Sequence, residues 1–428
     1  MVPRSSTAHT SSGLVLLDDW IVDLVKLVGK FGAALVTEPG VISIPALCPV
    51  KLVLHRHYYD RSLSNLEITS TIDAFWNDGL GRLVPPGDVQ AWKIAFTGNY
   101  LAVLASTGVV HIWDSSNFTE LGKVSHGEPV TAMVLSSSGL KVATYGLKTT
   151  KLWSVDGGNL LPSTVNPPYA RAIANHFAES DRKLLIGGND NIVRHISCDN
   201  FERGWQILNP ALLNEAGTVY GVIFNSPICL SVNGDGSLVG ASYRGAPLSV
   251  WRLADARCLN RCRRAKTFQS KYGQNSANWF AVDKFTWNPI TNHILGIYRD
   301  GCIFKWHPLT EENVEAHAAA DEIAVSPNGK VFATSSSNGS VHVWSFAHFS
   351  VIYKLSSEDL VIGLTFSPGS DRFYDIRCGS INVWEPSTPT HFLGRGKDEE
   401  SNRGEDQSDF TLFGYSESQV NHFKAITA

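Results

Sequence analysis

The 428-residue chain is short of charge, because Asp, Glu, Lys and Arg together make up only 18% of it. About a quarter is usual for globular proteins. Its 36 Lys and Arg stand against 40 Asp and Glu, which gives a formal net charge of -4 at pH 7. This balance excludes a strongly basic nucleic-acid binder, although it leaves room for a local basic patch. Only 2 Met are present, while 36 Gly and 12 Trp favour many short buried strands and tight turns.

The cysteines show no spacing typical of metal sites or disulfide frameworks. The 7 Cys include no C-x-x-C pair, and the nearest two, Cys258 and Cys262, have no His or Cys close by. An odd count without ligand spacing predicts neither a disulfide framework nor a zinc site. We therefore expect no metal, no cofactor and no small-molecule substrate. Free buried thiols are typical of a reducing compartment, which predicts a cytoplasmic protein.

Uninterrupted apolar segments of membrane length are missing as well. Charge-free runs at 94–113 and 331–353 carry Gly-Asn or Asn-Gly turn signals in the middle. A membrane span needs about 20 apolar residues without such breaks, so these runs predict hairpins and no membrane partner. Residues 1–13 are polar and lack the apolar core of a secretory signal. They are predicted to be disordered.

The two ends of the chain differ from its middle in hydrophobic pattern and in charge. Residues 14–36 place apolar side chains at helical spacing, with acids near the start and Lys near the end. This pattern predicts a helix within an N-terminal extension that covers 14–87. Residues 395–409 hold nine charges in fifteen positions and no apolar residue, so 395–428 is predicted to be a charged linker or tail.

A pattern recurs from residue 88 onwards: two apolar stretches separated by a turn, then a turn bearing Gly or Asp, then an alternating stretch that ends in Trp. The seven ends are Trp113, Trp153, Ile196 (where a Trp is expected), Trp251, Trp306, Trp344 and Trp384. A period of about 40–45 residues ending in Trp is the signature of WD repeats, with four strands per propeller blade. The sequence therefore predicts an all-β, seven-bladed WD40-like β-propeller over 88–394.

Closure of such a ring uses a strand from the other end of the repeat region. Residues 66–72 (LEITSTI) alternate and carry β-branched side chains, so they are predicted to complete the blade that ends at Trp384. Residues 390–393 are the competing candidate.

Four phrases are more specific than the spacing of the Trp residues: WNDGLGRL (76–83), HGEPV (126–130), ATYGLKTTKLW (143–153) and FYDIRCGSINVWEP (373–386). They resemble the C-terminal propeller region of fungal NACHT–WD-repeat proteins, which belong to the STAND group of signal-transducing NTPases and are often compared with NOD-like receptors. The resemblance implies a non-catalytic recognition module, the sensor-like part of such a signalling system, that binds a protein or peptide.

The chain departs from that family in two ways. It has no G-x-x-x-x-G-K-[ST] phosphate-binding loop, so the NACHT NTPase function does not carry over. Standard repeats also place an Asp six residues before the Trp, and only Asp300 and Asp190 fill that position. The other five turns have Thr107, Leu147, Gly245, Asn338 and Cys378 there. We therefore expect the His–Ser–Asp–Trp hydrogen-bond network of the repeat to be mostly missing.

The turns between the second and third strands of the blades open on one face, where Tyr and Arg recur. Arg244, Arg299 and Arg377 stand seven residues before a blade end, and Tyr145, Tyr243 and Tyr298 stand eight before. Because Tyr and Arg dominate binding hot spots, these six residues are the predicted partner-binding face, and the Arg set favours an acidic partner. The alternative is that each Tyr is a wedge between blades.

A basic segment lies in one of two long insertions. Its cations are Arg261, Arg263, Arg264, Lys266 and Lys271, and no acid interrupts them. Residues 257–271 are therefore a candidate anion-binding loop for lipid headgroups or nucleic acid, against the alternative of a solvated surface loop. A propeller enzyme is the weaker alternative, since neither G-x-S-x-G nor H-E-x-x-H occurs and no catalytic residue can be named.

The missing phosphate-binding loop generates a direct test. Without its backbone cradle and Lys, nothing in the chain is expected to hold the β- and γ-phosphates of a nucleotide. The purified chain should release no phosphate from Mg-ATP above a buffer blank. Phosphate release that co-elutes with the protein through two chromatographic steps would contradict the expectation.

Overall fold

The computed structural model describes residues 79–386, apart from 88, 116–117, 214–225, 245, 266–269, 275 and 358. The predicted disordered start (1–13), most of the extension (14–87) and the charged tail (395–428) lie outside the described residues. Nearly all described residues belong to one compact unit, Arg82–Ser116 and Glu120–Glu417.

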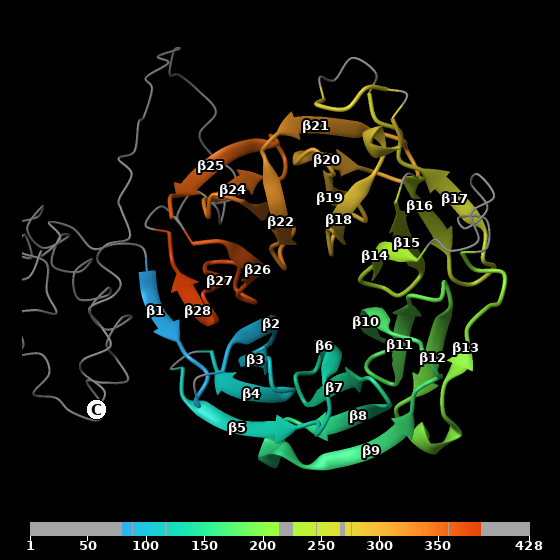
Figure 1. Ribbon diagram of the computed structural model, residues 1–428, viewed down its shortest axis with the longest axis vertical. Coiled ribbons are helices and arrows are strands. Elements are labelled where there is room, and N and C mark those ends of the chain that lie inside the picture. The colour runs from blue at the N-terminus through green and yellow to red at the C-terminus, as the bar shows by residue number, and fades with distance from the viewer. Residues whose placement is uncertain are drawn as a thin grey trace, which may run out of the picture. The chain divides into compact units, whose positions relative to one another are not determined.

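That unit consists of seven four-stranded antiparallel sheets, here called blades 1 to 7, arranged in a ring about a central axis (Figure 1). Blade 1 contains β2 (Ala91–Thr97), β3 (Tyr100–Ala105), β4 (Val109–Asp114) and β5 (Glu120–Ser125). Blade 2 contains β6 (Val130–Leu135), β7 (Lys141–Gly146), β8 (Thr149–Ser154) and β9 (Leu160–Val165). Blade 3 contains β10 (Ala172–Ala178), β11 (Lys183–Gly188), β12 (Val193–Ser197) and β13 (Gln206–Ile207).

The remaining blades repeat the same order from the central axis outwards. Blade 4 contains β14 (Pro227–Val232), β15 (Leu238–Tyr243), β16 (Ala246–Arg252) and β17 (Cys258–Arg261). Blade 5 contains β18 (Val282–Trp287), β19 (Ile294–Tyr298), β20 (Cys302–Trp306) and β21 (Asn313–His317). Blade 6 contains β22 (Ala320–Val325), β23 (Val331–Ser336), β24 (Val341–Ser345) and β25 (Ser350–Leu355). Blade 7 contains β26 (Val361–Phe366), β27 (Phe373–Arg377), β28 (Ser380–Trp384) and β1 (Gly79–Leu83).

The seven-bladed prediction is confirmed, and every predicted blade-ending residue lies on the third strand of its blade. The innermost strands contact their neighbours all the way round, including β26 with β2. Helix in the described part of the chain is limited to three short 3-10 turns, η3 (Asp156–Gly158), η4 (Phe201–Arg203) and η5 (Ala277–Trp279).

The predicted closing strand is wrong. The outer position of blade 7 is filled by β1, at residues 79–83, and not by 66–72. The side chain of Arg82 donates from Nε to Ser380 Oγ at 2.7 Å, which fixes β1 beside β28. Residues 66–72 and 390–393 lie outside the described residues, and the propeller strands begin at Gly79 rather than at 88.

The core lies between blades rather than within one. In the layer between blades 4 and 5, Leu248 and Val250 pack with Phe285 and Trp306 in a single buried cluster. Because successive side chains of a strand point to opposite faces, each blade contributes to two such layers. The alternating stretches that end in Trp therefore encode two buried faces per sheet.

Phe304 shows how tightly one of these layers is filled. Its ring is fully buried on β20 and packs against Tyr298, with ring centroids 4.6 Å apart. Opposite it stands Gly296, where an added Cβ would lie 2.3 Å from Phe304 Cζ. The ring occupies the volume that any larger residue at 296 would need.

We predict that Gly296→Ala destabilises the propeller by about 1–3 kcal/mol through overpacking, measured by urea denaturation. Gly122→Ala is the matched control, because a Cβ at Gly122 would meet nothing within 4 Å. Combining Gly296→Ala with Phe304→Leu should recover part of the loss. Equal effects of the two single Ala changes would contradict this account.

Candidate functional site

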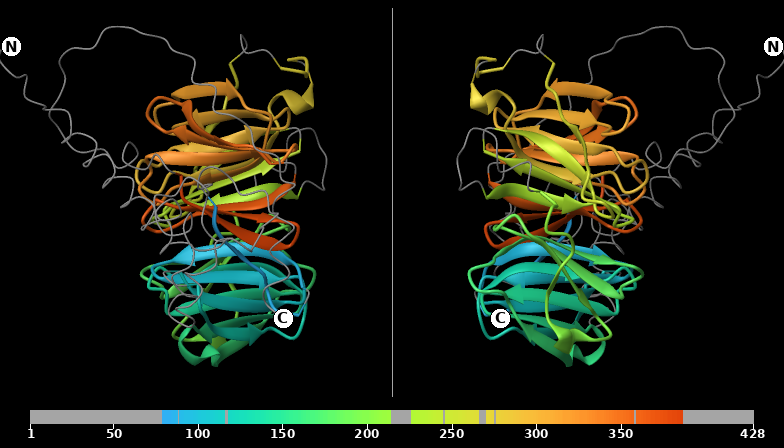
Figure 2. Two further views of the ribbon diagram at one scale, coloured as in Figure 1. Left: turned by 90° about the vertical axis from the view of Figure 1, so that its left-hand side faces the viewer. Right: turned by 90° about the vertical axis from the view of Figure 1, so that its right-hand side faces the viewer.

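Two kinds of loop lie on one face of the propeller: the turns between the second and third strands of each blade, and the links between successive blades. Strands run across the thickness of the ring (Figure 2), so an antiparallel blade sends its second-to-third turn and its link to the next blade to the same end. The innermost strand of each blade starts at this end. We call it the turn face, and its central part, where the seven innermost strands start, the mouth.

Every innermost strand carries a β-bulge immediately after its first residue, so its second residue has no partner in the ladder. A bulge bends the strand and redirects the extra side chain. The seven bulged residues form what we call the mouth ring: Trp92, Thr131, Ile173, Ile228, Asp283, Asp321 and Ile362.

The mouth ring is apolar on one side and charged on the other. Ile362 and Trp92 occupy neighbouring blades 7 and 1 and are 46% and 62% exposed. Ile228 of blade 4 is 37% exposed. Asp283 and Asp321 stand on blades 5 and 6. Large exposed apolar side chains bordered by charge are typical of an interaction surface.

Several cations surround Asp283. Burial raises the pKa of Asp283 above its ordinary value, and the opposing cations around it are Arg299, Lys284, Lys271 and Arg244. Arg299 Nη1 approaches Asp283 Oδ1 to 3.5 Å. The charged side of the mouth therefore contains both signs.

The three Tyr of the predicted partner-binding face do not reach the surface. Tyr145, Tyr243 and Tyr298 are 3%, 0% and 1% exposed. Their hydroxyls are used internally: Tyr145 donates to the Ala170 carbonyl of the following link at 3.1 Å, and Tyr243 to Asn191 Oδ1 at 2.9 Å. Burial raises the pKa of Tyr145 to about 12. These residues are wedges between blades, which was the alternative interpretation.

The three Arg of that face do not act as a set. Arg244 is exposed and Arg299 half-buried, but Arg377 is 2% exposed. Arg377 Nε donates to Asp375 Oδ2 at 2.8 Å, and the same carboxylate accepts from Trp384 Nε1 at 2.9 Å and Asn382 Nδ2 at 2.8 Å. Burial raises the pKa of Asp375 even with Arg377 beside it. Arg377 is therefore a structural partner of Asp375, so it cannot contact a ligand at the surface.

The cations of the candidate anion-binding loop do not share one environment, because one of them is buried and others are exposed. Arg264 has a fully buried side chain and pairs with Asp300 Oδ2 at 2.8 Å and with Glu315 Oε2 at 3.5 Å. Its guanidinium lies between the rings of Trp279 and Tyr298, at 4.9 and 4.3 Å from their centroids. Hydrogen bonds from Ser270 and Arg264 hold the pKa of Asp300 below its usual range despite burial. The loop is anchored by Arg264, which is not available to an external anion.

The other cations of that loop differ from Arg264. Arg261, Arg263 and Lys271 are exposed, and Lys266 lies outside the described residues. Anion binding by these exposed residues stays a prediction, and Arg264 no longer belongs to the predicted set.

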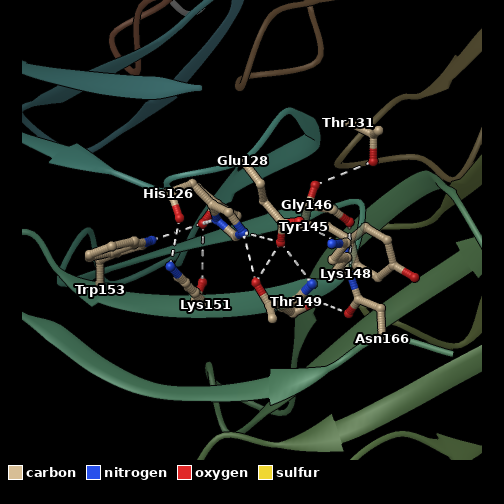
Figure 3. A network of polar contacts seen from close by, with 12 residues as sticks. His126, Glu128, Thr131, Tyr145, Gly146, Lys148, Thr149, Lys151, Trp153 and Asn166 are labelled. Atoms are coloured by element: carbon tan, nitrogen blue, oxygen red, sulfur yellow. Dashed lines mark hydrogen bonds and ion pairs between the residues drawn. The ribbon is translucent and has the colours of Figure 1, made fainter. Parts of the chain in front are cut away.

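Blade 2 retains the hydrogen-bond network that the sequence predicted to be mostly missing (Figure 3). His126 Nδ1 lies 2.7 Å from Thr144 Oγ1, which also accepts from Trp153 Nε1 at 2.8 Å. Glu128 takes the place of the absent turn Asp, because Oε1 lies 3.1 Å from His126 Nε2 and accepts from the backbone and the hydroxyl of Thr149 at 2.8 and 2.6 Å. The expectation is wrong for blade 2, because Leu147 fills the turn position and the carboxylate comes instead from Glu128, before the first strand of the blade.

A His between a hydroxyl and a carboxylate has the composition of a hydrolytic triad. Here His126 is 1% and Thr144 0% exposed, and the hydroxyl is already held by Trp153. Burial lowers the pKa of His126, so its neutral form is favoured. The cluster joins the link before β6 to β7 and β8 of the same blade, and it offers no opening to a substrate.

The described residues contain no group of three or more His, Cys, Asp or Glu side chains placed to hold a metal ion. Over the same residues, no helix has the length and apolar character needed to cross a bilayer.

Sequence reasoning missed the mouth ring. Trp92 stands outside the repeated Trp positions, and its only signal is a large aromatic residue next to the small Ala91 at the start of an alternating stretch. Small or β-branched buried residues recur at that first position, including Ala172 and Ala320. Their recurrence could have located the start of each innermost strand, although not its bulge.

The fold and its repeated Trp residues define a seven-bladed β-propeller of the WD40 type. The solved β-propeller domain of Cps50 (Swd1) from Myceliophteria thermophila matches it with a TM-score of 0.58 over 72% of this chain and 100% of that domain. At 13% sequence identity this likeness shows the fold alone. No family model matches the chain.

Curated relatives agree with the WD-repeat class. "WD repeat-containing protein 18" of Rattus norvegicus is 25% identical over 214 residues, and that of Bos taurus is 27% identical over 217. Each alignment covers 49% of this chain and 44% of the relative, so the chain spans less than half the length of these relatives. "Small ribosomal subunit protein RACK1y" of Oryza sativa is 25% identical over 26% of this chain and 35% of its own.

We predict that Arg377→Ala lowers the free energy of unfolding by about 3–5 kcal/mol, because it leaves the Asp375 carboxylate buried without its cation. Arg244→Ala, at an exposed position of the same face, should change it by no more than about 0.5 kcal/mol. Adding Asp375→Asn to Arg377→Ala should restore part of the stability in urea denaturation. A stable Arg377→Ala protein would return this residue to the binding face.

Proposed function

We propose that this chain is a non-catalytic protein-interaction scaffold and that its docking site is the mouth ring. The observation that carries the proposal is Trp92, which is 62% exposed at the bulge of β2, while the neighbouring blade 7 has Ile362, 46% exposed, at the equivalent bulge of β26. Trp is enriched in binding hot spots because it offers a large rigid contact area. The WD-repeat relatives support the same general role.

The backbone under the mouth ring favours such a role. Each bulged residue is carried by an innermost strand that is held on one side by its own blade and on both flanks by neighbouring blades. The bulges are therefore positioned before a partner arrives. A preorganised surface loses little conformational entropy on binding.

A finer proposal is that the chain is the sensor-like part of a fungal STAND or NACHT-type signalling system and acts in the cytoplasm. It is supported by the four phrases that resemble that family. Two of these phrases also contain structural clusters of the propeller, since HGEPV contains His126 and Glu128 and FYDIRCGSINVWEP contains Asp375 and Arg377. Genomic sequence upstream of Met1 tests it, because an in-frame phosphate-binding loop there would support it and a stop codon directly upstream would contradict it.

The scaffold proposal is tested by Trp92→Ser. Because Trp92 is mostly exposed, the variant should keep the melting temperature of the wild type. Proteins captured from an extract of the source cells by the immobilised wild-type chain should be lost with Trp92→Ser. Reconstitution with a purified captured protein should show binding weakened by about tenfold or more, equivalent to about 1.4 kcal/mol.

Leu309→Ser is the matched control. Leu309 is 63% exposed and lies between β20 and β21, hence on the face opposite the mouth. This variant should capture the same proteins as the wild type. If Leu309→Ser loses them and Trp92→Ser keeps them, the docking site is on the other face.

A further inference from the structure

A lysine stands next to the exposed tryptophan of the mouth ring. Lys93 is the third residue of β2 and follows the bulged Trp92 directly. Its Nζ donates to the backbone carbonyl of Thr131 at 2.9 Å. Thr131 is the bulged residue of β6 in the next blade, so the ammonium group of Lys93 lies at the level of the mouth ring.

This ammonium group has no counter-ion in the described part of the chain. No carboxylate there forms an ion pair with Lys93, and the Thr131 carbonyl is the hydrogen-bond acceptor of its ammonium group. The side chain is half-buried, and burial lowers the pKa of Lys93. Removing a cation from water without supplying an anion costs folding free energy. The fold keeps this unpaired cation at the mouth although it lowers stability, which favours a role for the Lys93 ammonium group in binding.

Blade 5 provides an internal comparison. Lys284 is also the third residue of its innermost strand and also follows a bulged residue. There the ammonium group pairs with Glu322 of blade 6. The position corresponding to Glu322 in blade 2, one blade after Lys93, is Ala132. The third residue of the innermost strand is thus a lysine in both blades, but only Lys284 has a carboxylate partner in the next blade.

We propose that Lys93 binds a carboxylate of a protein partner, while an apolar side chain next to that carboxylate packs on Trp92 and Ile362. This inference rests on the mouth ring being the docking site, and it adds the chemistry of the partner: an extended acidic and apolar peptide. Charge complementarity favours this occupant, because the partner would supply the anion that Glu322 supplies to Lys284. A carboxylate would also use hydrogen-bond donors of Lys93 that Thr131 leaves free.

The experiment uses a library of random heptapeptides displayed on phage, selected on the immobilised full chain. Peptides that depend on the mouth are identified by loss of binding to Trp92→Ser. Among these, we expect Asp or Glu beside a large apolar residue to be enriched. Selection on Lys93→Met should abolish the enrichment of acids and retain that of apolar residues.

The matched control removes the equivalent lysine together with its partner. Lys284→Met combined with Glu322→Gln removes this ion pair as a unit, while Asp283 keeps Arg299. The double variant should select the same acidic peptides as the wild type. A synthetic peptide from the selected pool should bind Lys93→Met about tenfold or more weakly, and its Glu→Gln or Asp→Asn analogue should bind the wild type equally weakly. Free and amidated C-termini of this peptide distinguish a terminal carboxylate from a side-chain one.

The melting temperature separates this role from a structural one. Because Met removes a desolvated cation and keeps the apolar stem, Lys93→Met should melt at or above the temperature of the wild type. A fall of several degrees would make Lys93 a structural residue and overturn the inference. So would acidic enrichment that survives in Lys93→Met, or Trp92-dependent peptides without acids. If no selected peptide depends on Trp92, the proposed docking site itself fails.

Discussion

The structure depends on one constraint: a four-stranded sheet with two apolar faces can bury them only between two similar sheets. The buried clusters lie between neighbouring blades, as the contact of Leu248 and Val250 with Trp306 shows. No blade is therefore complete by itself, and the first needs the last. Closure of blade 7 by β1 satisfies this need, and it also fixes the seven bulges around one mouth. The candidate site is thus a product of ring closure more than of any single repeat.

The number of blades could be predicted from the sequence because it follows from local alternation and from the spacing of the blade ends. The closing strand could not. Residues 66–72 have the higher β-propensity, whereas β1 (GLGRL) contains two Gly and reads as a weak strand. Its place is decided by the free edge of β28 and by the contact of Arg82 with Ser380, and both are distant in sequence. Context overrides intrinsic propensity at such positions.

The predicted partner-binding face is wrong at its three Tyr residues and at Arg377 for a related reason. Equivalent positions in a repeat share a place in the blade but not the same surroundings. Tyr243 is the buried last residue of β15, whereas Arg244 is exposed in the turn that follows. Arg377 differs from Arg244 because Asp375, two residues earlier on the same face of β27, draws its guanidinium inward. That spacing was visible in the sequence. The bulges that expose Trp92 depend on strand register, which composition and periodicity do not contain.

Ring closure by β1 has a consequence for synthesis of the chain. Arg82 and its partner Ser380 are 298 residues apart, so the first propeller strand to leave the ribosome waits for the last one. At roughly 5–20 residues per second this delay is about 15–60 s. During that time β1 has no ladder partner. Blade 1 also lacks blade 7, so the face of blade 1 that packs against β26 is uncovered. Unpaired strands and open apolar faces invite aggregation. The order of strands along the gene thus makes the newly made chain most vulnerable just before its final blade appears.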